Sequence, residues 1–164
     1  MQGRDKLLLR VDNMPLVRRV ATNALATNCP LFVTLPAQNQ PRLKALAGLA
    51  LTQVEIETPQ DGMAASLTAG LRVLPSGLRG VMVVLGDMPD VSVQDLRQLL
   101  AAFDTDSDKI IRATDTNNRP GHPVIFPARL FDDLAQLTGD TGARDILQAQ
   151  DVISVVLPDA NATP

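Results

Sequence analysis

Apolar and polar residues follow one another along the chain in segments that predict strands and helices in turn. Apolar residues at helical spacing predict helices, and short apolar runs bounded by Gly, Pro or Asp predict strands. The expected helices cover 14–26, 41–49, 63–74, 91–103, 127–137 and 142–150, and the expected strands cover 29–35, 51–56, 81–85, 109–113, 122–126 and 152–157. This alternation predicts an α/β fold, a Rossmann-like three-layer sandwich with a mostly parallel sheet and helices on both faces.

The aliphatic run at 81–85 is the clearest strand, and it ends abruptly in Gly86-Asp87-Met88-Pro89. A continuous apolar run predicts a strand that is buried on both faces. Because open α/β sheets bind ligands outside the carboxyl ends of their strands, Asp87 is expected at the ligand-binding edge. Gly86 would let the backbone turn and a ligand approach closely. The Asp87 carboxylate would then hold Mg²⁺ against phosphate oxygens, although it could instead serve only to cap the following helix region. Ser92 is expected as the N-cap of the helix predicted at 91–103.

The composition narrows the class of protein. The chain has 164 residues, of which 45% are apolar, and this is enough for one α/β domain with a sizeable core. It has no Trp or Tyr, so stacking on exposed nucleic-acid bases is not expected. A net charge of −3 without a basic block also argues against a nucleic-acid partner.

Membrane and metal-cluster proteins are disfavoured as well. No apolar run approaches the roughly 20 residues of a membrane span, and the N-terminus lacks the pattern of a signal peptide, so a cytoplasmic protein is expected. Cys29 and His122 are the only residues of their types, which excludes an intrachain disulfide and a metal site built from several histidines or cysteines. Cys29 is expected to be a buried core thiol.

Short segments spread over nearly the whole chain resemble one family. They are residues 1–8, the run Gly62-Met63-Ala64-Ala65-Ser66-Leu67-Thr68-Ala69-Gly70-Leu71, Gly86-Asp87-Met88-Pro89, Gly121-His122-Pro123-Val124 and 139–144. In this order and spacing they resemble the MobA-like nucleotidyltransferases of molybdenum cofactor maturation. The run at 62–71 is similar to that of the molybdenum cofactor cytidylyltransferase branch, whereas the guanylyltransferase branch is expected to carry Gly-Pro-Leu there.

The resemblance implies a Rossmann-like enzyme that transfers a nucleotide from a nucleoside triphosphate and releases pyrophosphate. For this branch the donor is CTP, the acceptor is the molybdopterin form of the cofactor and the product is its cytosine dinucleotide. Mg²⁺ is the implied metal, with Mn²⁺ as the alternative. A molybdoenzyme or its maturation chaperone is the implied protein partner.

The resemblance and the residue chemistry together give each candidate residue a role. Asp87 and Lys6 are the candidate catalytic residues, and Asp87 is the candidate metal ligand. The other candidates are Gly3, Lys6, Gly62, Met63, Ser66 and Gly86 for the nucleotide, and Gly121, His122 and Arg144 for the acceptor. Lys6 would neutralise phosphate charge, and the N–H groups at the start of the helix near Gly62 suit a phosphate. The plainer interpretations are a solvated lysine, a helix start capped by Asp61 and a structural histidine.

The chain departs from the family pattern at both ends. The Gly-rich loop that opens the family's domain and its acidic C-terminal segment are missing, so residues 1–164 are expected to form one nucleotidyltransferase domain that is incomplete at both ends. Two alternatives therefore stay open. One is an enzyme of the same fold that uses GTP or a sugar-phosphate acceptor, and the other is a non-catalytic protein that binds or carries the molybdenum cofactor.

Overall fold

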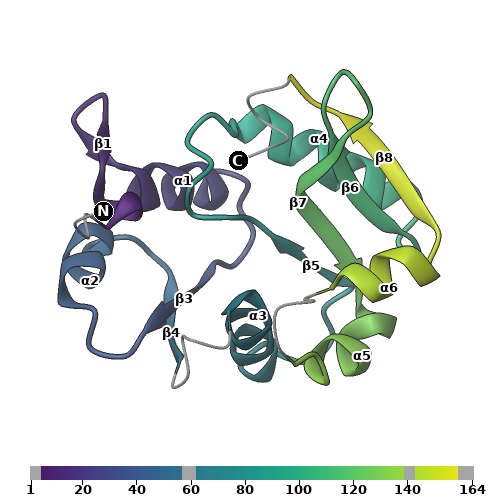
Figure 1. Cartoon of the computed structure of the whole chain (residues 1–164), viewed down its shortest axis with the longest axis horizontal. Coiled ribbons are helices and arrows are strands. Elements are labelled where there is room, and N and C mark those ends of the chain that lie inside the picture. Colours follow the sequence, from purple (N-terminus) through teal and green to yellow (C-terminus); the bar gives the residue numbers. More distant parts are fainter. Residues whose placement is uncertain (1–4, 57–61, 139–142, 159–164) are drawn as a thin grey trace.

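The computed structural model describes residues 5–56, 62–138 and 143–158. Strands and helices alternate as the sequence predicts (Figure 1). In chain order the elements are η1 (Lys6–Leu8), β1 (Arg10–Val11), β2 (Met14–Pro15), α1 (Leu16–Leu25), β3 (Phe32–Pro36), α2 (Gln40–Leu46), β4 (Thr52–Ile56), α3 (Gly62–Arg72), β5 (Gly80–Val83), α4 (Val93–Thr105), β6 (Ile110–Thr114), β7 (Pro120–Pro127), η3 (Ala128–Leu130), α5 (Phe131–Ala135), α6 (Arg144–Ala149) and β8 (Val152–Val156).

Local capping explains where the central helix begins. Ser92 precedes α4, and its hydroxyl accepts a hydrogen bond from the Asp95 N–H at 3.2 Å. The Asp95 carboxylate in return accepts the Ser92 N–H at 2.8 Å, which completes a capping box. The prediction of Ser92 as the N-cap is therefore confirmed. The helix predicted at 127–137 is instead divided into the short helices η3 and α5.

The larger sheet has the strand order β5-β7-β6-β8 and is mixed. Strands β6 and β8 are parallel, whereas β7 runs antiparallel to both β5 and β6. The predicted α/β fold class is confirmed, and within it this larger sheet is mixed and not mostly parallel. The reason is local: the Asp115 carboxylate accepts the N–H groups of Asn117 and Arg119, at 2.9 and 2.8 Å, and folds the link between β6 and β7 into a tight turn. A link this short can only join antiparallel strands.

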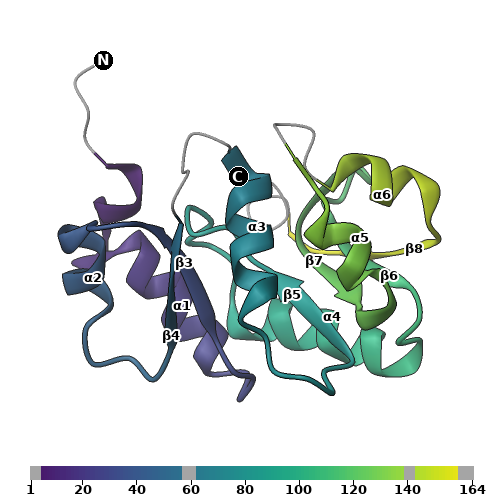
Figure 2. The ribbon, with the colours of Figure 1, turned by 90° about the horizontal axis from the view of Figure 1, so that it is seen from below.

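Helices cover both faces of this sheet, as predicted (Figure 2). On one face Leu99 and Phe103 of α4 pack against Ile111, Ala113 and Ile125. On the other face Ile110, Val124 and Phe126 pack with Leu130 and Leu134, under residues of α3 and α6. Alternate residues of each strand therefore enter opposite cores, which makes this sheet the centre of the molecule. None of the described helices has both the length and the apolar character that a bilayer crossing requires.

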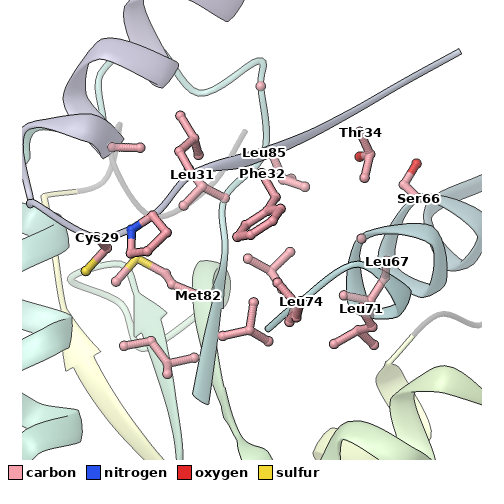
Figure 3. Close-up of a pocket in the computed structure, with 18 of the residues that line it drawn as sticks. Cys29, Leu31, Phe32, Thr34, Ser66, Leu67, Leu71, Leu74, Met82 and Leu85 are labelled. Atoms are coloured by element: carbon pink, nitrogen blue, oxygen red, sulfur yellow. The ribbon is translucent and has the colours of Figure 1, made fainter. Parts of the chain in front are cut away.

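The smaller sheet consists of β3 and β4, which are parallel. Among the described strands, β3 pairs only with β4, and β5 pairs only with β7 along its length. A cleft of about 810 Å³ lies between them, and its lining includes Leu31, Phe32, Leu74, Met82 and Leu85 (Figure 3). Strand β5 is consequently only half-buried along its length, so the prediction of burial on both faces is wrong. Cys29 precedes β3 at this cleft and is exposed, which corrects the prediction of a core thiol.

Candidate functional site

The candidate site begins with an ion pair at the end of β5. Lys6 Nζ donates a hydrogen bond to Asp87 Oδ2 at 3.0 Å. The two side chains are 63% and 28% exposed, respectively, and pairs this exposed contribute little to folding stability. The helix that follows Asp87, α4, is capped by Ser92 and Asp95, so the plainer interpretation of Asp87 as its cap is not what the structure shows.

A surface depression of about 700 Å³ surrounds this pair. Its lining residues are Asp5, Lys6, Leu7, Arg42, Met63, Leu85, Gly86 and Asp87. Met63 belongs to the first turn of α3 and is 49% exposed, so the start of this helix meets Lys6 and Asp87 at one depression. The unpaired N–H groups of a helix start and its positive dipole end favour an anion. Ser66, one turn further along α3, lines the adjoining cleft (Figure 3).

Two glycines of the predicted nucleotide site, Gly62 and Gly86, lie among the described residues, and their backbones differ. Gly62 has a φ of +69°, a backbone conformation that residues with side chains rarely adopt. Gly86 has no positive φ, so the turn after β5 does not require glycine. A Cβ atom on Gly86 would lie 3.4 Å from a methyl carbon of Leu7, so the missing side chain leaves room for Leu7 to approach the turn.

His122 lies beside the same turn on the other flank of β5. The antiparallel register aligns Val83 with Val124, which brings Gly121 and His122 to the carboxyl end of β5. Burial lowers the pKa of His122, and the positive charge of Arg112 lowers it further, while a hydrogen bond with the Val83 backbone and the charge of Asp87 act in the opposite direction. The imidazole is therefore neutral at pH 7. Its buried Nδ1 has no hydrogen-bond partner among the residues that the structure describes.

Arg112 is a member of this region that the sequence interpretation missed. It lies in β6, is half-buried, and donates from Nε to the Gly121 carbonyl at 3.1 Å. Burial lowers the pKa of the guanidinium, and no ion pair joins Arg112 to a carboxylate within the described ranges. A cation placed directly between the apolar residues Ile111 and Ala113 of β6 was the signal in the sequence that could have identified it.

Two further candidates are not brought into the site by the described structure. Arg144 is the first residue of α6 and is exposed, and no hydrogen bond or ion pair joins it to another residue of the described part of the chain. Gly3 lies outside the described residues, as does Asp61, the expected cap of α3.

The donor set suits a metal ion that is shared with a substrate. No group of three or more His, Cys, Asp or Glu side chains comes together in the residues that the structure describes, so a cage made of protein ligands alone is not found there. Mg²⁺ commonly uses one or two carboxylates and takes its other ligands from water and phosphate oxygens. Asp87, a partly exposed carboxylate at a strand end beside an open depression, fits such a site.

Comparison with known proteins places these features in a family. The MobA-like NTP transferase domain matches residues 1–153 of the chain. A protein of Natronomonas pharaonis named "Probable molybdenum cofactor guanylyltransferase" is 30% identical over 154 residues, which cover 93% of this chain and 75% of that protein.

Solved structures share the fold. The crystal structure of Rv0371c from Mycobacterium tuberculosis superposes with a TM-score of 0.86 at 24% identity, covering 99% of this chain and 82% of that one. A second structure of Rv0371c, in complex with manganese, gives a TM-score of 0.82 at 25% identity and covers 95% of this chain and 83% of that one. The fold, the strand-end carboxylate and the match over residues 1–153 agree, and the chain therefore belongs to the MobA-like NTP transferase domain family of nucleotidyltransferases.

Proposed function

We propose that the protein transfers CMP from CTP to the phosphate group of a molybdopterin-type cofactor and releases pyrophosphate. The observation that carries this proposal is the contact between Lys6 and Asp87, at 3.0 Å, beside the start of α3. A cation, a carboxylate able to hold a metal and a helix N-terminus are the groups that a bound triphosphate needs.

On the donor side, the chain's own groups bind and orient the triphosphate. Lys6 would neutralise the charge of the phosphates and of the departing pyrophosphate, and the first N–H groups of α3 would hold a phosphate oxygen. Asp87 would hold Mg²⁺, or Mn²⁺ in its place, and the bound cation would supply further neutralisation of phosphate charge. An acceptor phosphate oxygen forms a bond to the α-phosphorus, and the bond from that phosphorus to the bridging oxygen breaks.

On the acceptor side, His122 and Arg112 are the proposed contacts. A phosphate acceptor is already ionised at pH 7, so it needs no general base and can use a neutral imidazole as a hydrogen-bonding partner. Arg112 brings a positive charge that no carboxylate neutralises among the described residues. A desolvated guanidinium binds phosphate strongly because its N–H groups match the phosphate oxygens.

CTP is proposed as the donor because of the run Gly62-Met63-Ala64-Ala65-Ser66-Leu67, which is similar to that of the cytidylyltransferase branch. GTP is a second candidate because the Natronomonas pharaonis relative is named as a guanylyltransferase. Met63 and the adjoining cleft are the surfaces that would meet the base.

The test is a donor and acceptor panel. Labelled CTP, GTP, ATP and UTP are each incubated with Mg²⁺ and with molybdopterin or a sugar phosphate, and pyrophosphate release and labelled product are measured. The expected result is product from CTP and molybdopterin. If product forms only with GTP, the proposed donor is wrong and GTP takes its place. If product forms only with a sugar phosphate, the proposed acceptor is wrong and the sugar phosphate takes its place. Calorimetric titration that detects molybdopterin binding but no nucleotide binding would indicate the non-catalytic carrier instead.

A further inference from the structure

The ion pair with Asp87 does not by itself account for the position of the Lys6 ammonium. Lys6 lies in η1, a helix of only three residues, and its side chain is 63% exposed. An exposed ammonium on a flexible stem gains little from pairing with a carboxylate in water. The contact with Asp87 is therefore not enough to fix the ammonium at 3.0 Å, and another part of the structure must hold the turn.

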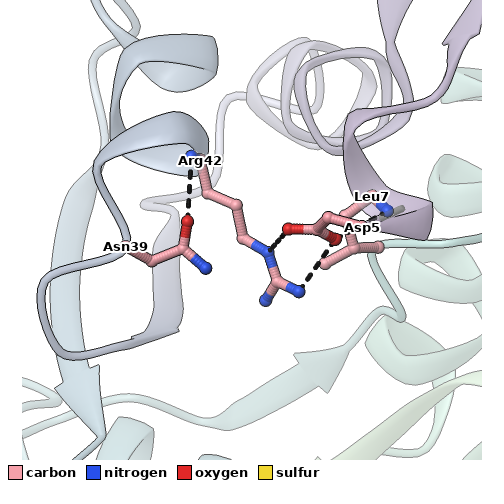
Figure 4. Close-up of polar contacts among 4 residues, drawn as sticks. All are labelled: Asp5, Leu7, Asn39 and Arg42. Carbon is pink, nitrogen blue, oxygen red and sulfur yellow. Dashed lines mark hydrogen bonds and ion pairs between the residues drawn. The ribbon is translucent and has the colours of Figure 1, made fainter. Parts of the chain in front are cut away.

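Asp5, the residue before η1, is the centre of that support (Figure 4). Its Oδ1 accepts the Leu7 N–H at 3.1 Å, which caps η1. The same carboxylate accepts two hydrogen bonds from Arg42, from Nε at 2.7 Å and from Nη2 at 2.9 Å. Both side chains are largely shielded, with 24% and 21% exposed, and the guanidinium holds the pKa of Asp5 below its usual range.

Arg42 is itself held in place by the capping and packing of α2. It lies in the first turn of α2, and its N–H donates to Asn39 Oδ1 at 3.2 Å, which caps that helix. At the other end of α2, Leu46 is buried in a core cluster that Leu7 also packs against. A two-bond contact between a planar guanidinium and a carboxylate fixes orientation as well as distance. The chain of contacts thus runs from α2 through Arg42 and Asp5 to the turn that carries Lys6.

We propose that Asp5 and Arg42 are positioning residues that hold Lys6 over Asp87, an inference that rests on the proposed role of Lys6 in binding the triphosphate. Neither residue needs to touch the nucleotide in this role. Their effect on the reaction passes through the placement of the Lys6 ammonium, and misplacement of a binding group by about 1 Å can lower a rate roughly 100-fold.

The test is a double-mutant series with steady-state kinetics on the full chain. Asp5→Asn and Arg42→Gln are each expected to lower kcat/KM by roughly 10- to 100-fold. Arg42→Lys keeps the charge but cannot form the two-bond contact, so it is not expected to restore activity. In a Lys6→Ala background, the same substitutions are expected to cause no further loss, because the group that they position is absent.

The matched control is Arg18→Gln. Arg18 also holds α2, through hydrogen bonds from Nη1 to the carbonyls of Ala45 and Ala47 at 2.9 Å each, but it donates none to Asp5. This variant is expected to keep wild-type kcat/KM even if its melting temperature falls. An equal loss of activity in Arg18→Gln would show that α2 packing alone matters and would overturn the inference.

The other possible outcomes also test the positioning role of Asp5 and Arg42. Full activity of Asp5→Asn and Arg42→Gln, with Lys6→Ala impaired, would overturn the positioning role and leave the proposed function standing. A further loss in the Lys6→Ala background would show that Arg42 or Asp5 acts independently of Lys6, which also contradicts the inference. Wild-type activity of Lys6→Ala would reject the role of Lys6 itself, and with it the positioning role.

Discussion

The two sheets of this protein differ in how completely their strands are buried. In the larger sheet, β6 and β7 are buried along most of their length and helices pack on both faces. In the smaller sheet, three of the five residues of β4 are exposed and β3 has only Leu35 fully buried. The candidate site lies where the two regions meet, since η1, which carries Lys6, packs through Leu7 against the core of the smaller sheet and its helices, while Asp87 follows β5 of the larger sheet. The larger sheet is therefore the well-packed region that carries Asp87, and the smaller sheet with its helices places the Lys6 ammonium beside that carboxylate.

A matched pair of valines tests this difference directly. Val124 in β7 is 1% exposed, whereas Val33 in β3 is only half-buried. Val124→Ala removes two methyl groups from a closed core and is expected to lower the free energy of unfolding by about 2–3 kcal/mol. Val33→Ala is expected to cost about 1 kcal/mol, because its surroundings are already partly open to water. Urea unfolding of both variants measures the difference, and equal losses would contradict the contrast between the sheets.

His122 is expected to make the free energy of unfolding depend on pH, and the variant His122→Gln tests this contribution. Because burial lowers the pKa of His122 in the folded state, the unfolded chain takes up a proton first as the pH falls below about 6.5. The contribution of the neutral imidazole is therefore fully present above that pH and is lost as the pH falls toward the folded-state pKa. The free energy of unfolding is expected to decrease between pH 7 and 5, and His122→Gln is expected to flatten this slope. An unchanged slope would show that other groups cause it.

Chemical labelling of Cys29 tests whether the cleft beside the smaller sheet is open to solvent, and it requires no substitution. The thiol is exposed beside the cleft between β3 and β5. A thiol-specific reagent such as DTNB is expected to label native protein within minutes, at a rate close to that of urea-unfolded protein at the same pH, because access and not unfolding limits the reaction. Protection of the native thiol by more than about 100-fold would mean that the cleft is closed in solution.

The sequence predicted the features that depend on neighbours in the chain. The alternation of strands and helices, the Ser92 cap and the turn after 81–85 all follow from residues within one or two turns of each other. Asp87 could be assigned to a strand end for the same reason. Lys6 lies 81 positions away along the chain and was assigned to the same site with the help of the family resemblance, and no local pattern predicts its contact with Asp87.

The features that the sequence did not predict depend on long-range partners. The antiparallel direction of β7 requires knowing that β6 and β7 form a hairpin, and the half-burial of β5 depends on which strands flank it. Asp5 and Arg42 are 37 positions apart, and Arg42 belongs to none of the segments that resemble the family, so their contact could not be read from composition or spacing. Arg112 was overlooked because a strand arginine is usually a surface residue.

The central claim is that the Asp87 carboxylate serves nucleotide transfer and not folding. The most direct measurement is pyrophosphate release from CTP and Mg²⁺ with molybdopterin by Asp87→Asn, beside the control Asp106→Asn, which alters an exposed ion pair with Lys109 outside both the depression around Lys6 and Asp87 and the adjoining cleft. Asp87→Asn is expected to lose roughly 10²–10³-fold in rate, while its melting temperature stays within about 2 °C of that of the wild type. Wild-type turnover by Asp87→Asn, or an equal loss of activity in Asp106→Asn, would contradict the account.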